Sequence, residues 1–355
     1  MAPETTTESP SIRVVARAAG VSVATVSRVL NGTGPVRDET RRRVLDAVEA
    51  LAYVPHSAAR SLSTRRTSSV GVLLPDLHGE FFSELIRGID LTARRAGYHV
   101  LVSGSHSEPA EVEAVLRTLH GRVDGLIVLA TGLSGDVRGA RLPRRLPIVL
   151  LNDPQPRPAH DSIRIDNRGG ARSATEHLLE LGHRRVAMIC GPEDNTDAAE
   201  RLQGFQEALA ARGLAAEPRW LLEGDFREES GHRAGAALAA LDPRPTAVLA
   251  ANDAMAIGCL SALRERGLAV PGDVALAGFD DIPISRFLSP PLTSVRVAIA
   301  ELGGRAMEQL IHAIERDPAT PRHHEVVAAT LVVRASTSAP SGAPREPTNA
   351  GRDRR

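Results

Sequence analysis

Five side chains between residues 23 and 28 have the types and the spacing that a DNA-reading surface needs. We expect residues 23–30 to form a helix whose apolar residues face inward. The side chains left on its outer face are Val23, Ala24, Thr25, Ser27 and Arg28. Arg28 suits a bidentate contact with O6 and N7 of guanine, and the small apolar Val23 and Ala24 suit close approach to a thymine methyl group. These residues favour a surface that reads base edges in the major groove.

The flanking sequence predicts the helices that would position this surface. Apolar residues recur at helical spacing over residues 12–19, Gly20 can take the positive φ of a tight turn, and Ser22 can cap the next helix. A third helix is expected over residues 38–52, and its buried residues are expected to be Val44, Leu45, Val48 and Leu51. A helix, a glycine-containing turn and a second helix form the layout of helix-turn-helix domains.

The charge of this region points to the same partner. Residues 11–66 carry ten arginines and four acidic residues, a net charge of +6, whereas the whole chain is neutral. A local positive patch favours a polyphosphate, and binding through it weakens as salt rises. The alternative is a small three-helix bundle without nucleic acid. The outward arginine and the local charge favour DNA.

From residue 69 onward, short apolar runs alternate with amphipathic segments. Strands rich in Val, Ile and Leu are expected at 69–75, 98–104, 124–130 and 147–151, and the alternation restarts after residue 167. Such strands, separated by helices, indicate parallel sheets covered on both faces. The predicted fold class is therefore α/β, with an all-α helix-turn-helix domain followed by two doubly wound lobes.

Polar and aromatic residues follow these strands, where ligands of doubly wound sheets bind. The positions of interest are Phe82, Asn152, Asn195, Asp197, Arg201, Phe226, Asn252 and Asp280. Aromatic faces together with amide, carboxylate and guanidinium groups suit a hydroxyl-rich ligand. Two neighbours have plainer interpretations: Asp253 as a helix cap and Phe81 as a core residue.

Nearly the whole chain resembles the LacI/GalR family of bacterial repressors, with a headpiece of the galactose-repressor-like type. The resemblance lies in the runs AGVSVATVSRVLN, TRRRVLDAVEALAYVP and AARSL, and the spacing continues from Ser11 to Ser336. It implies that residues 57–62 form a hinge helix that orders on operator DNA, with Leu62 wedged into the minor groove. The residues expected to contact DNA are Ser22, Val23, Ala24, Thr25, Ser27, Arg28, Asn31, Arg60 and Leu62.

The resemblance also assigns roles in the body. It implies that Arg201 in ERLQGF anchors an effector, that Phe226 in GDFREESG stacks on it, and that Asp280 in GFDD lies at the cleft. Phe82, Asn152, Asn195, Asp197 and Asn252 are carried over from matching positions.

The sequence departs from the family pattern at three positions. Val14 stands where Asp is usual, and His56 stands where Asn usually precedes the hinge. Glu80 stands where sugar-binding members often carry Asn. The effector class therefore stays open between a carbohydrate, which we expect first, and a nucleoside or purine.

The expected domain boundaries follow from these patterns. They are a disordered start (1–10), a helix-turn-helix domain (11–55), a hinge helix and linker (56–68), an N-terminal lobe (69–164 and 295–324), a C-terminal lobe (165–294 and 325–337) and a disordered tail (338–355). The tail contains no leucine heptad, so we expect a homodimer, whose two-fold symmetry matches a palindromic operator.

Composition excludes several other classes of protein. Cys190 and Cys259 lie in apolar runs, which predicts no disulfide framework and fits the cytoplasm. No apolar run approaches ~20 residues and no signal pattern opens the chain, so neither a membrane partner nor a periplasmic-type solute-binding protein is favoured. Without a nucleophile elbow, a phosphate loop or metal-ligand spacing, we expect no catalytic residue, no cofactor and no metal. The sequence thus predicts a cytoplasmic repressor that binds double-stranded operator DNA and a small effector.

Overall fold

The computed structural model describes residues 11–32, 34–53, 66–105, 109–130, 146–154, 158–317 and 320–340. The chain divides into two compact units. The first ends at Ser68 and the second begins at Ser69, and each is described by itself.

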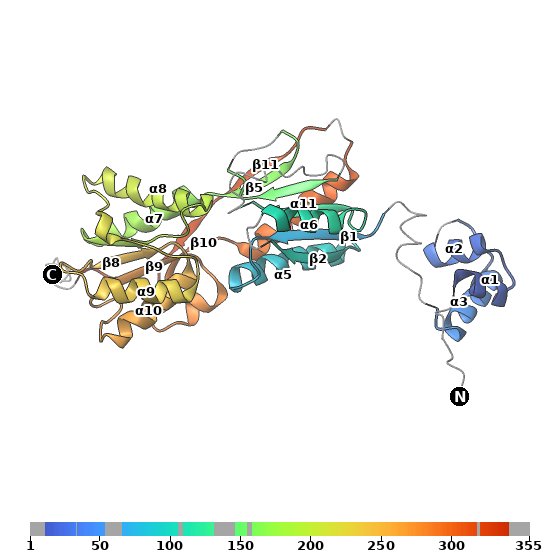
Figure 1. Cartoon of the computed structure of the whole chain (residues 1–355), viewed down its shortest axis with the longest axis horizontal. Coiled ribbons are helices and arrows are strands. Elements are labelled where there is room, and N and C mark those ends of the chain that lie inside the picture. Colours follow the sequence, from blue (N-terminus) through green and yellow to red (C-terminus); the bar gives the residue numbers. More distant parts are fainter. Residues whose placement is uncertain are drawn as a thin grey trace, which may run out of the picture. The chain divides into compact units, whose positions relative to one another are not determined.

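The first unit contains the headpiece, a bundle of three helices (Figure 1). They are α1 (Ile12–Ala18), α2 (Val23–Asn31) and α3 (Asp38–Ala50). Its fully buried apolar residues are Val15, Ala16, Ala19, Val26, Val29, Val44 and Tyr53. Gly20 takes φ +64° in the turn, and the hydroxyl oxygen of Ser22 accepts from the amide N–H of Thr25 at 3.1 Å. Both local predictions are confirmed, and together they set the start of α2.

The predicted burial of α3 is wrong at one position. Val44 is fully buried, but Leu45 is 48% exposed, and the helix ends at Ala50 instead of residue 52. Val44 occupies the position that faces α1 and α2, and successive residues of a helix point about 100° apart. Leu45 therefore turns outward.

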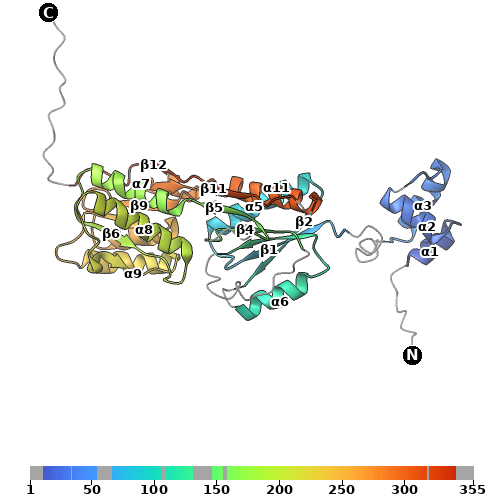
Figure 2. The same ribbon diagram turned by 90° about the horizontal axis from the view of Figure 1, so that it is seen from above.

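The second unit begins with a lobe built on a six-stranded parallel sheet. Its strand order is β11-β5-β4-β3-β1-β2. The strands are β1 (Ser69–Leu74), β2 (His99–Gly104), β3 (Gly125–Leu129), β4 (Ile148–Leu151), β5 (Asp161–Ile165) and β11 (His324–Val327). Helices α5 (Glu80–Arg95) and α11 (Ile299–Glu315) cover one face, and α6 (Pro109–Leu119) covers the other (Figure 2). We refer to this part as the first lobe.

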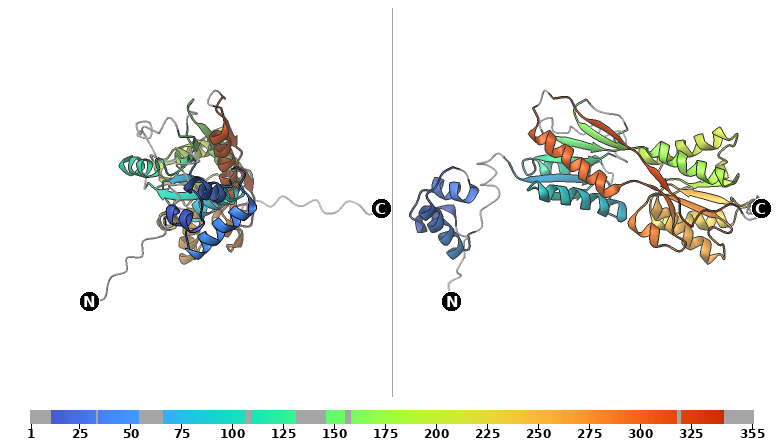
Figure 3. Two further views of the ribbon diagram at one scale, coloured as in Figure 1. Left: turned by 90° about the vertical axis from the view of Figure 1, so that its right-hand side faces the viewer. Right: turned by 180° about the vertical axis from the view of Figure 1, so that it is seen from behind.

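The second lobe repeats the pattern on a sheet of order β12-β10-β9-β8-β6-β7. Its strands are β6 (Val186–Ile189), β7 (Leu221–Leu222), β8 (Ala247–Ala250), β9 (Ala275–Asp280), β10 (Thr293–Arg296) and β12 (Thr330–Val332). Its helices are α7 (Asn167–Glu180), α8 (Thr196–Ala211), α9 (Glu228–Ala239) and α10 (Asp253–Glu265), with short 3₁₀ helices η1 (Pro218–Trp220) and η2 (Pro283–Phe287). The pair α7 and α8 covers one face, and the pair α9 and α10 covers the other (Figures 1 and 3). All neighbouring strands are parallel except β10 and β12.

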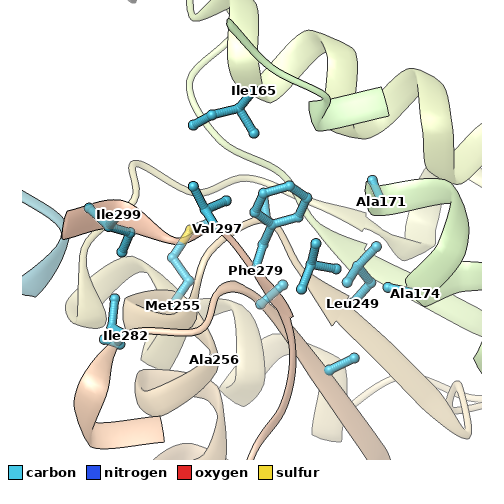
Figure 4. Close-up of a cluster of buried hydrophobic side chains, with 14 of the residues drawn as sticks. Ile165, Ala171, Ala174, Leu249, Met255, Ala256, Phe279, Ile282, Val297 and Ile299 are labelled. Carbon is cyan, nitrogen blue, oxygen red and sulfur yellow. The ribbon is translucent and has the colours of Figure 1, made fainter. Parts of the chain in front are cut away.

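Strands covered on both faces bury almost every side chain, which explains their continuous apolar runs. The residues of β3, β4, β6 and β8 are all buried. Figure 4 shows Phe279 of β9 in the centre of the core, with Val297 on one side and Ala171 and Ala174 of α7 on the other. The predicted fold class is confirmed.

The chain passes between the two sheets three times, and two of these crossings differ from the predicted boundaries. Because β10 still pairs with β9 at Arg296, the second crossing lies at 297–298 and not at 294–295. Because β11 pairs with β5 in the first sheet, the third crossing lies at 328–329 and not at 324–325. Strands β5 and β11 were not predicted, since the first contains Asp and Arg and the second is half exposed.

The predicted disordered tail also begins too early. The backbone oxygen of Ser338 accepts a hydrogen bond from the buried ring of His183 at 2.8 Å, so residues 338–340 pack on the second lobe. Residues 1–10 and 341–355 lie outside the described residues. None of the helices that the structure describes combines the length and hydropathy needed to cross a bilayer.

Candidate functional site

Helix α2 presents the predicted base-reading surface to solvent. Val23 is 41% exposed, Ala24 and Arg28 are exposed, and the apolar Val26 and Val29 hold the opposite face in the core. Among the described residues, no hydrogen bond or ion pair holds the guanidinium of Arg28. That group is therefore free to reach a base edge.

Polar groups beside Arg28 are linked to one another. Ser22 and Thr25 share a hydrogen bond between their hydroxyl oxygens at 2.9 Å, and the amide of Asn31 donates to the hydroxyl of Ser27 at 3.2 Å. These four predicted DNA contacts are therefore positioned before any partner binds. The remaining two, Arg60 and Leu62, lie with the hinge segment outside the described residues.

A cavity of about 460 Å³ lies between the first and second lobes. Seven of the eight predicted effector residues line it, namely Phe82, Asn195, Asp197, Arg201, Phe226, Asn252 and Asp280. These residues come from the N-terminus of α5, from the loops before α8, α9 and α10, from α8 itself and from the end of β9. The parallel strands of each sheet bring these segments together because their carboxyl ends share one edge.

A buried ion pair lies at the centre of this site. Arg201 and Asp280 are each only 4% exposed, and the guanidinium of Arg201 approaches Asp280 Oδ1 at 3.3 Å. The same guanidinium donates to the amide oxygen of Asn167 and to the backbone oxygen of Ala251, and it lies 3.8 Å from the ring centre of Phe279. These contacts hold the Arg201 guanidinium in place at the cavity.

Burial strongly affects the carboxylates around Arg201. It raises the pKa of Asp197 and of Asp280 to about 6 each, even though the positive charge of Arg201 opposes the shift. Asp280 Oδ1 is buried and, beyond its ion pair with Arg201 at 3.3 Å, accepts no hydrogen bond from the described residues. A ligand hydroxyl could satisfy that oxygen, which makes Asp280 the strongest candidate for direct ligand contact.

Phe226 depends on a neighbour that the sequence did not single out. Its backbone takes φ +69°, and the ring passes directly over Gly191. A Cβ at Gly191 would lie 2.5 Å from the Cζ atom of Phe226. The lack of a side chain at Gly191 therefore leaves the space that this ring occupies. The need for glycine at this position becomes visible only in the three-dimensional structure.

Two predicted ligand residues also cap helices. The amide oxygen of Asn195 accepts from the backbone N–H of Ala198, and that of Asn252 accepts from Met255. Asn252 additionally donates to the backbone oxygen of Phe226 at 2.9 Å. Both caps fix the start of a helix at the cavity, and the amide N–H groups of Asn195 donate to none of the described residues, so they are available for a ligand.

Asn152 is the exception among the predicted effector residues, because it does not line the cavity. Its amide oxygen accepts from the N–H of Ile165, and its amide nitrogen donates to Asp197 Oδ2 at 2.8 Å. Asn152 belongs to the first lobe and Asp197 to the second. The side chain therefore joins the lobes, and because it lies outside the cavity lining its direct role as an effector contact is not supported.

Further interlobe contacts connect the segment 76–80 with the second lobe. Arg227 donates to Asp76 Oδ2 at 2.7 Å, and Glu80 Oε2 accepts from the backbone N–H of Ile284 at 3.1 Å. All four of these residues line the cavity. The structure thus has the lobes in contact around the ligand space.

Two interpretations of neighbouring residues need revision. Phe81 packs against the core, as predicted, but it also lines the cavity with Phe82, and the two rings meet edge to face with centroids 5.5 Å apart. Asp253 is not the cap of α10, because Asn252 fills that position. Asp253 is instead fully buried and accepts from the N–H of Ile282 and from the hydroxyls of Ser285 and Ser294.

Over the part of the chain that the structure describes, no three His, Cys, Asp or Glu side chains are arranged to hold a metal ion.

The chain combines a helix-turn-helix bundle with a two-lobed body that encloses a cavity. This combination defines a class of protein, the DNA-binding regulators that sense a small molecule.

Comparisons with known proteins identify the family. Residues 11–56 match the model of bacterial regulatory proteins of the lacI family, and residues 175–337 match the periplasmic binding protein-like domain. The transcriptional regulator GalR of Escherichia coli K12 is 37% identical over 333 residues, covering 93% of this chain and 96% of GalR. The transcriptional repressor PurR of Mannheimia succiniciproducens is 36% identical over 328 residues, covering 92% and 98%.

Solved structures give the same result. A lac repressor dimer bound to operator and the anti-inducer ONPF has a TM-score of 0.82 at 30% identity, covering 94% of this chain and 100% of that one. The regulator CelR in complex with cellobiose has a TM-score of 0.70 at 33% identity, covering 92% and 99%. The chain belongs to the LacI family of bacterial transcriptional regulators, and the relatives are regulators and not enzymes, as predicted.

Proposed function

We propose that the chain is a homodimeric cytoplasmic repressor whose affinity for a palindromic operator is set by a small effector bound between its lobes. One observation carries the proposal. The chain that presents an exposed Arg28 on α2 also contains an interlobe cavity of about 460 Å³, in which Asp280 Oδ1, ion-paired with Arg201, accepts no hydrogen bond from the described residues. A base-reading surface and a ligand cavity in one chain together suit a DNA-binding sensor.

The DNA half of the proposal rests on α2 and the headpiece charge. Arg28 would contact a guanine, and Val23 and Ala24 would approach thymine methyl groups. A two-fold dimer would place two such helices on the half-sites of a palindrome. The lac repressor of the solved complex is a dimer on its operator, and we infer the same assembly here.

A carbohydrate is the first effector candidate. The rings of Phe82 and Phe226 can cover apolar C–H faces of a sugar, while Asp197 and Asp280 accept from its hydroxyls. CelR was solved with cellobiose. A nucleoside or purine is the second candidate, because the same rings can stack on a base. PurR, at 36% identity, is also a relative.

The effector would act through the angle between the lobes. An effector shifts operator affinity only by the difference between its affinities for the two lobe arrangements. The interlobe contacts of Asp76, Glu80 and Asn152 would change in geometry with that angle. A changed angle in both protomers would in turn alter the distance between their hinge segments.

The test measures operator binding by the full-length protein. Fluorescence anisotropy reports the binding, and the DNA comes from upstream of the protein's own gene. Log affinity should fall linearly with log salt for specific and nonspecific DNA alike. A thermal-shift screen of mono- and disaccharides, nucleosides and purines should find a compound that stabilises the protein and changes operator affinity. Leu62→Ser should abolish specific binding and leave the stabilising compound bound.

Two results would separate the alternatives. A protein that binds a sugar but no upstream DNA would be a solute-binding protein. A protein that binds its operator with the same affinity whether or not the compound is bound would be a DNA-binding protein without a sensor.

A further inference from the structure

The cavity between the lobes has a strongly negative lining. Six acidic side chains border it, namely Asp76, Glu80, Asp197, Asp225, Glu228 and Asp280, against two arginines and one histidine. With the histidine neutral, the described lining carries a net charge of −4. Because the complete chain is neutral and residues 11–66 carry +6, the remaining residues carry a net −6, and the cavity lining gathers much of that negative charge in one place.

Each basic group of the lining is already engaged by the protein. Arg201 is bound by Asn167, Ala251 and Asp280. Arg227 is paired with Asp76 at 2.7 Å, and His78 lies 3.6 Å from Glu228. Among the described residues, therefore, none of the basic groups in the lining is free to receive a phosphate or carboxylate.

The carboxylates of the lining outnumber the basic groups that pair with them. Among the described residues, Glu80 accepts from the backbone N–H of Ile284 and has no ion-pair partner. Asp197 accepts only from the neutral amides of Asn152 and Asn167. Asp280 Oδ1 is buried in the ion pair with Arg201 and accepts no hydrogen bond from the described residues. The cavity consequently offers oxygen acceptors in excess of donors.

From this we propose that the effector carries no negative charge and binds through hydroxyl or ammonium donors, as a neutral sugar, an amino sugar or a neutral nucleoside would. Phosphorylated forms of the same compounds are rejected. This inference rests on the proposed function of the cavity as the effector site. It adds a restriction on the net charge of the effector that holds for a carbohydrate and for a nucleoside alike.

The physical basis is the low dielectric of a closed cleft. An anion between the lobes would be desolvated beside carboxylates, and like charges in such contact repel one another strongly. A hydroxyl or ammonium group instead donates to carboxylate oxygens that have capacity for a further hydrogen bond. The phosphorylated form of a binding compound should therefore bind on the order of 100-fold more weakly than its parent.

The experiment compares matched compounds on the full-length protein at low ionic strength. The sets are glucose, glucosamine and glucose 6-phosphate; galactose, galactosamine and galactose 6-phosphate; and adenosine with adenosine 5′-monophosphate. Thermal shift identifies compounds that bind, and calorimetry gives their affinities. At least one neutral or amino compound should bind, and its phosphorylated counterpart should lose ~100-fold in affinity.

A pair of charge variants tests the cause. Glu80→Gln combined with Glu228→Gln removes two negative charges from the cavity lining and should improve the relative affinity of the phosphorylated compound by about tenfold or more. Glu315→Gln with Glu113→Gln removes the same charge from exposed sites outside the cavity and should leave the ratio unchanged. Equal ratios in both double variants would refute the electrostatic cause.

Other outcomes overturn the restriction on net charge without touching the proposed function. A phosphorylated compound that binds as tightly as its parent and alters operator affinity would end the restriction while keeping the sensor. A complete lack of binding by the neutral and amino compounds would remove the assigned ligand class. Operator binding, measured separately, decides the proposed function itself.

Discussion

Arg28 lies exposed on α2 with its guanidinium unengaged, so its truncation removes a potential base contact without a cost to the headpiece core. A bidentate arginine–guanine contact contributes roughly 1–3 kcal/mol of discrimination. Arg28→Ala should therefore weaken specific operator binding about 10- to 100-fold and leave nonspecific binding nearly unchanged. Anisotropy titrations on operator and scrambled DNA measure both.

Arg122→Ala is the matched control for this variant, because Arg122 is an exposed arginine in the body. It should not change either affinity. Equal losses on operator and scrambled DNA with Arg28→Ala would place this side chain on phosphates instead of bases.

Gly191 and Phe226 make a second prediction at the scale of single residues. An added Cβ at position 191 would lie 2.5 Å from the ring of Phe226 and 2.8 Å from Ala198. Gly191→Ala should displace the ring and weaken the binding of any compound identified in the thermal-shift screen at least about tenfold, since stacking on an aromatic side chain contributes a kcal/mol or more. Calorimetry measures the loss.

The double variant tests the mechanism of that loss. In a Phe226→Ala background the ring is absent, so adding Gly191→Ala should cost little more, and the two effects should be non-additive. Additive losses would show that Gly191 acts on the ligand by another route.

Much of the site was predictable from motifs, but only where the motif determines which way the side chain points. Arg201, Phe226 and Asp280 line the cavity as the sequence predicted. Asn152 could not be placed correctly, because both its amide groups bind protein atoms from two segments that come together only in the fold. Gly191 escaped notice because its importance lies in the space left for another ring.

Among the elements, the segment from β9 to η2 depends on the buried Asp253. Burial, together with the nearby Asp280, raises the pKa of Asp253 to about 8 from its ordinary value of 3.8. The folded state therefore holds a proton more tightly than the unfolded chain. The stability contributed in this way is complete below about pH 4 and is lost as the pH rises through about 8.

Asp253→Asn cannot ionise, so its free energy of unfolding should change less between pH 5 and pH 8 than that of the unmodified protein. Part of the slope should remain, because the pKa values of Asp197 and Asp280 are also raised. Urea titrations at four pH values measure it. Asp90→Asn, at a half-exposed position on α5, should keep the full slope. An unaltered slope in Asp253→Asn would mean that Asp253 is ionised in the folded protein.

The sequence predicted elements well where one physical signal dominated. Strands covered on both faces, such as β3 and β4, were clear from unbroken apolar runs. β5 and β11 were missed because they form the outer part of their sheet and carry charged residues such as Arg164 and Glu325. The crossings were displaced for the same reason, since β11 was not recognised as part of the first sheet.

For the whole molecule, the contact between Asn152 and Asp197 is one of the direct links between the lobes. Asn152→Asp would set a second carboxylate 2.8 Å from Asp197 Oδ2, and like charges at that distance repel strongly. We expect the lobes to separate and the effector-dependent change in operator affinity to shrink. Small-angle scattering measures the first effect, and anisotropy with and without the stabilising compound measures the second.

Asn195→Asp is the control for this variant. It adds the same charge and preserves the helix cap, because Asp caps helices as well as Asn does, and its described hydrogen bond stays within the second lobe. It should leave the scattering profile unchanged. If Asn152→Asp responds to the effector as the unmodified protein does, the contact plays no part in the transmission between sites.

The three crossings between the sheets have a consequence for how the protein is made. The first sheet needs β11 at residues 324–327 and the second needs β12 at residues 330–332, so a ribosome must release nearly the whole chain before either can close. The headpiece has its own core and is complete once residue 53 has emerged, and N-terminal units fold first during synthesis. A nascent chain thus acquires its DNA-reading part well before its sensor exists. Products of premature termination would carry that part with no metabolite control over it.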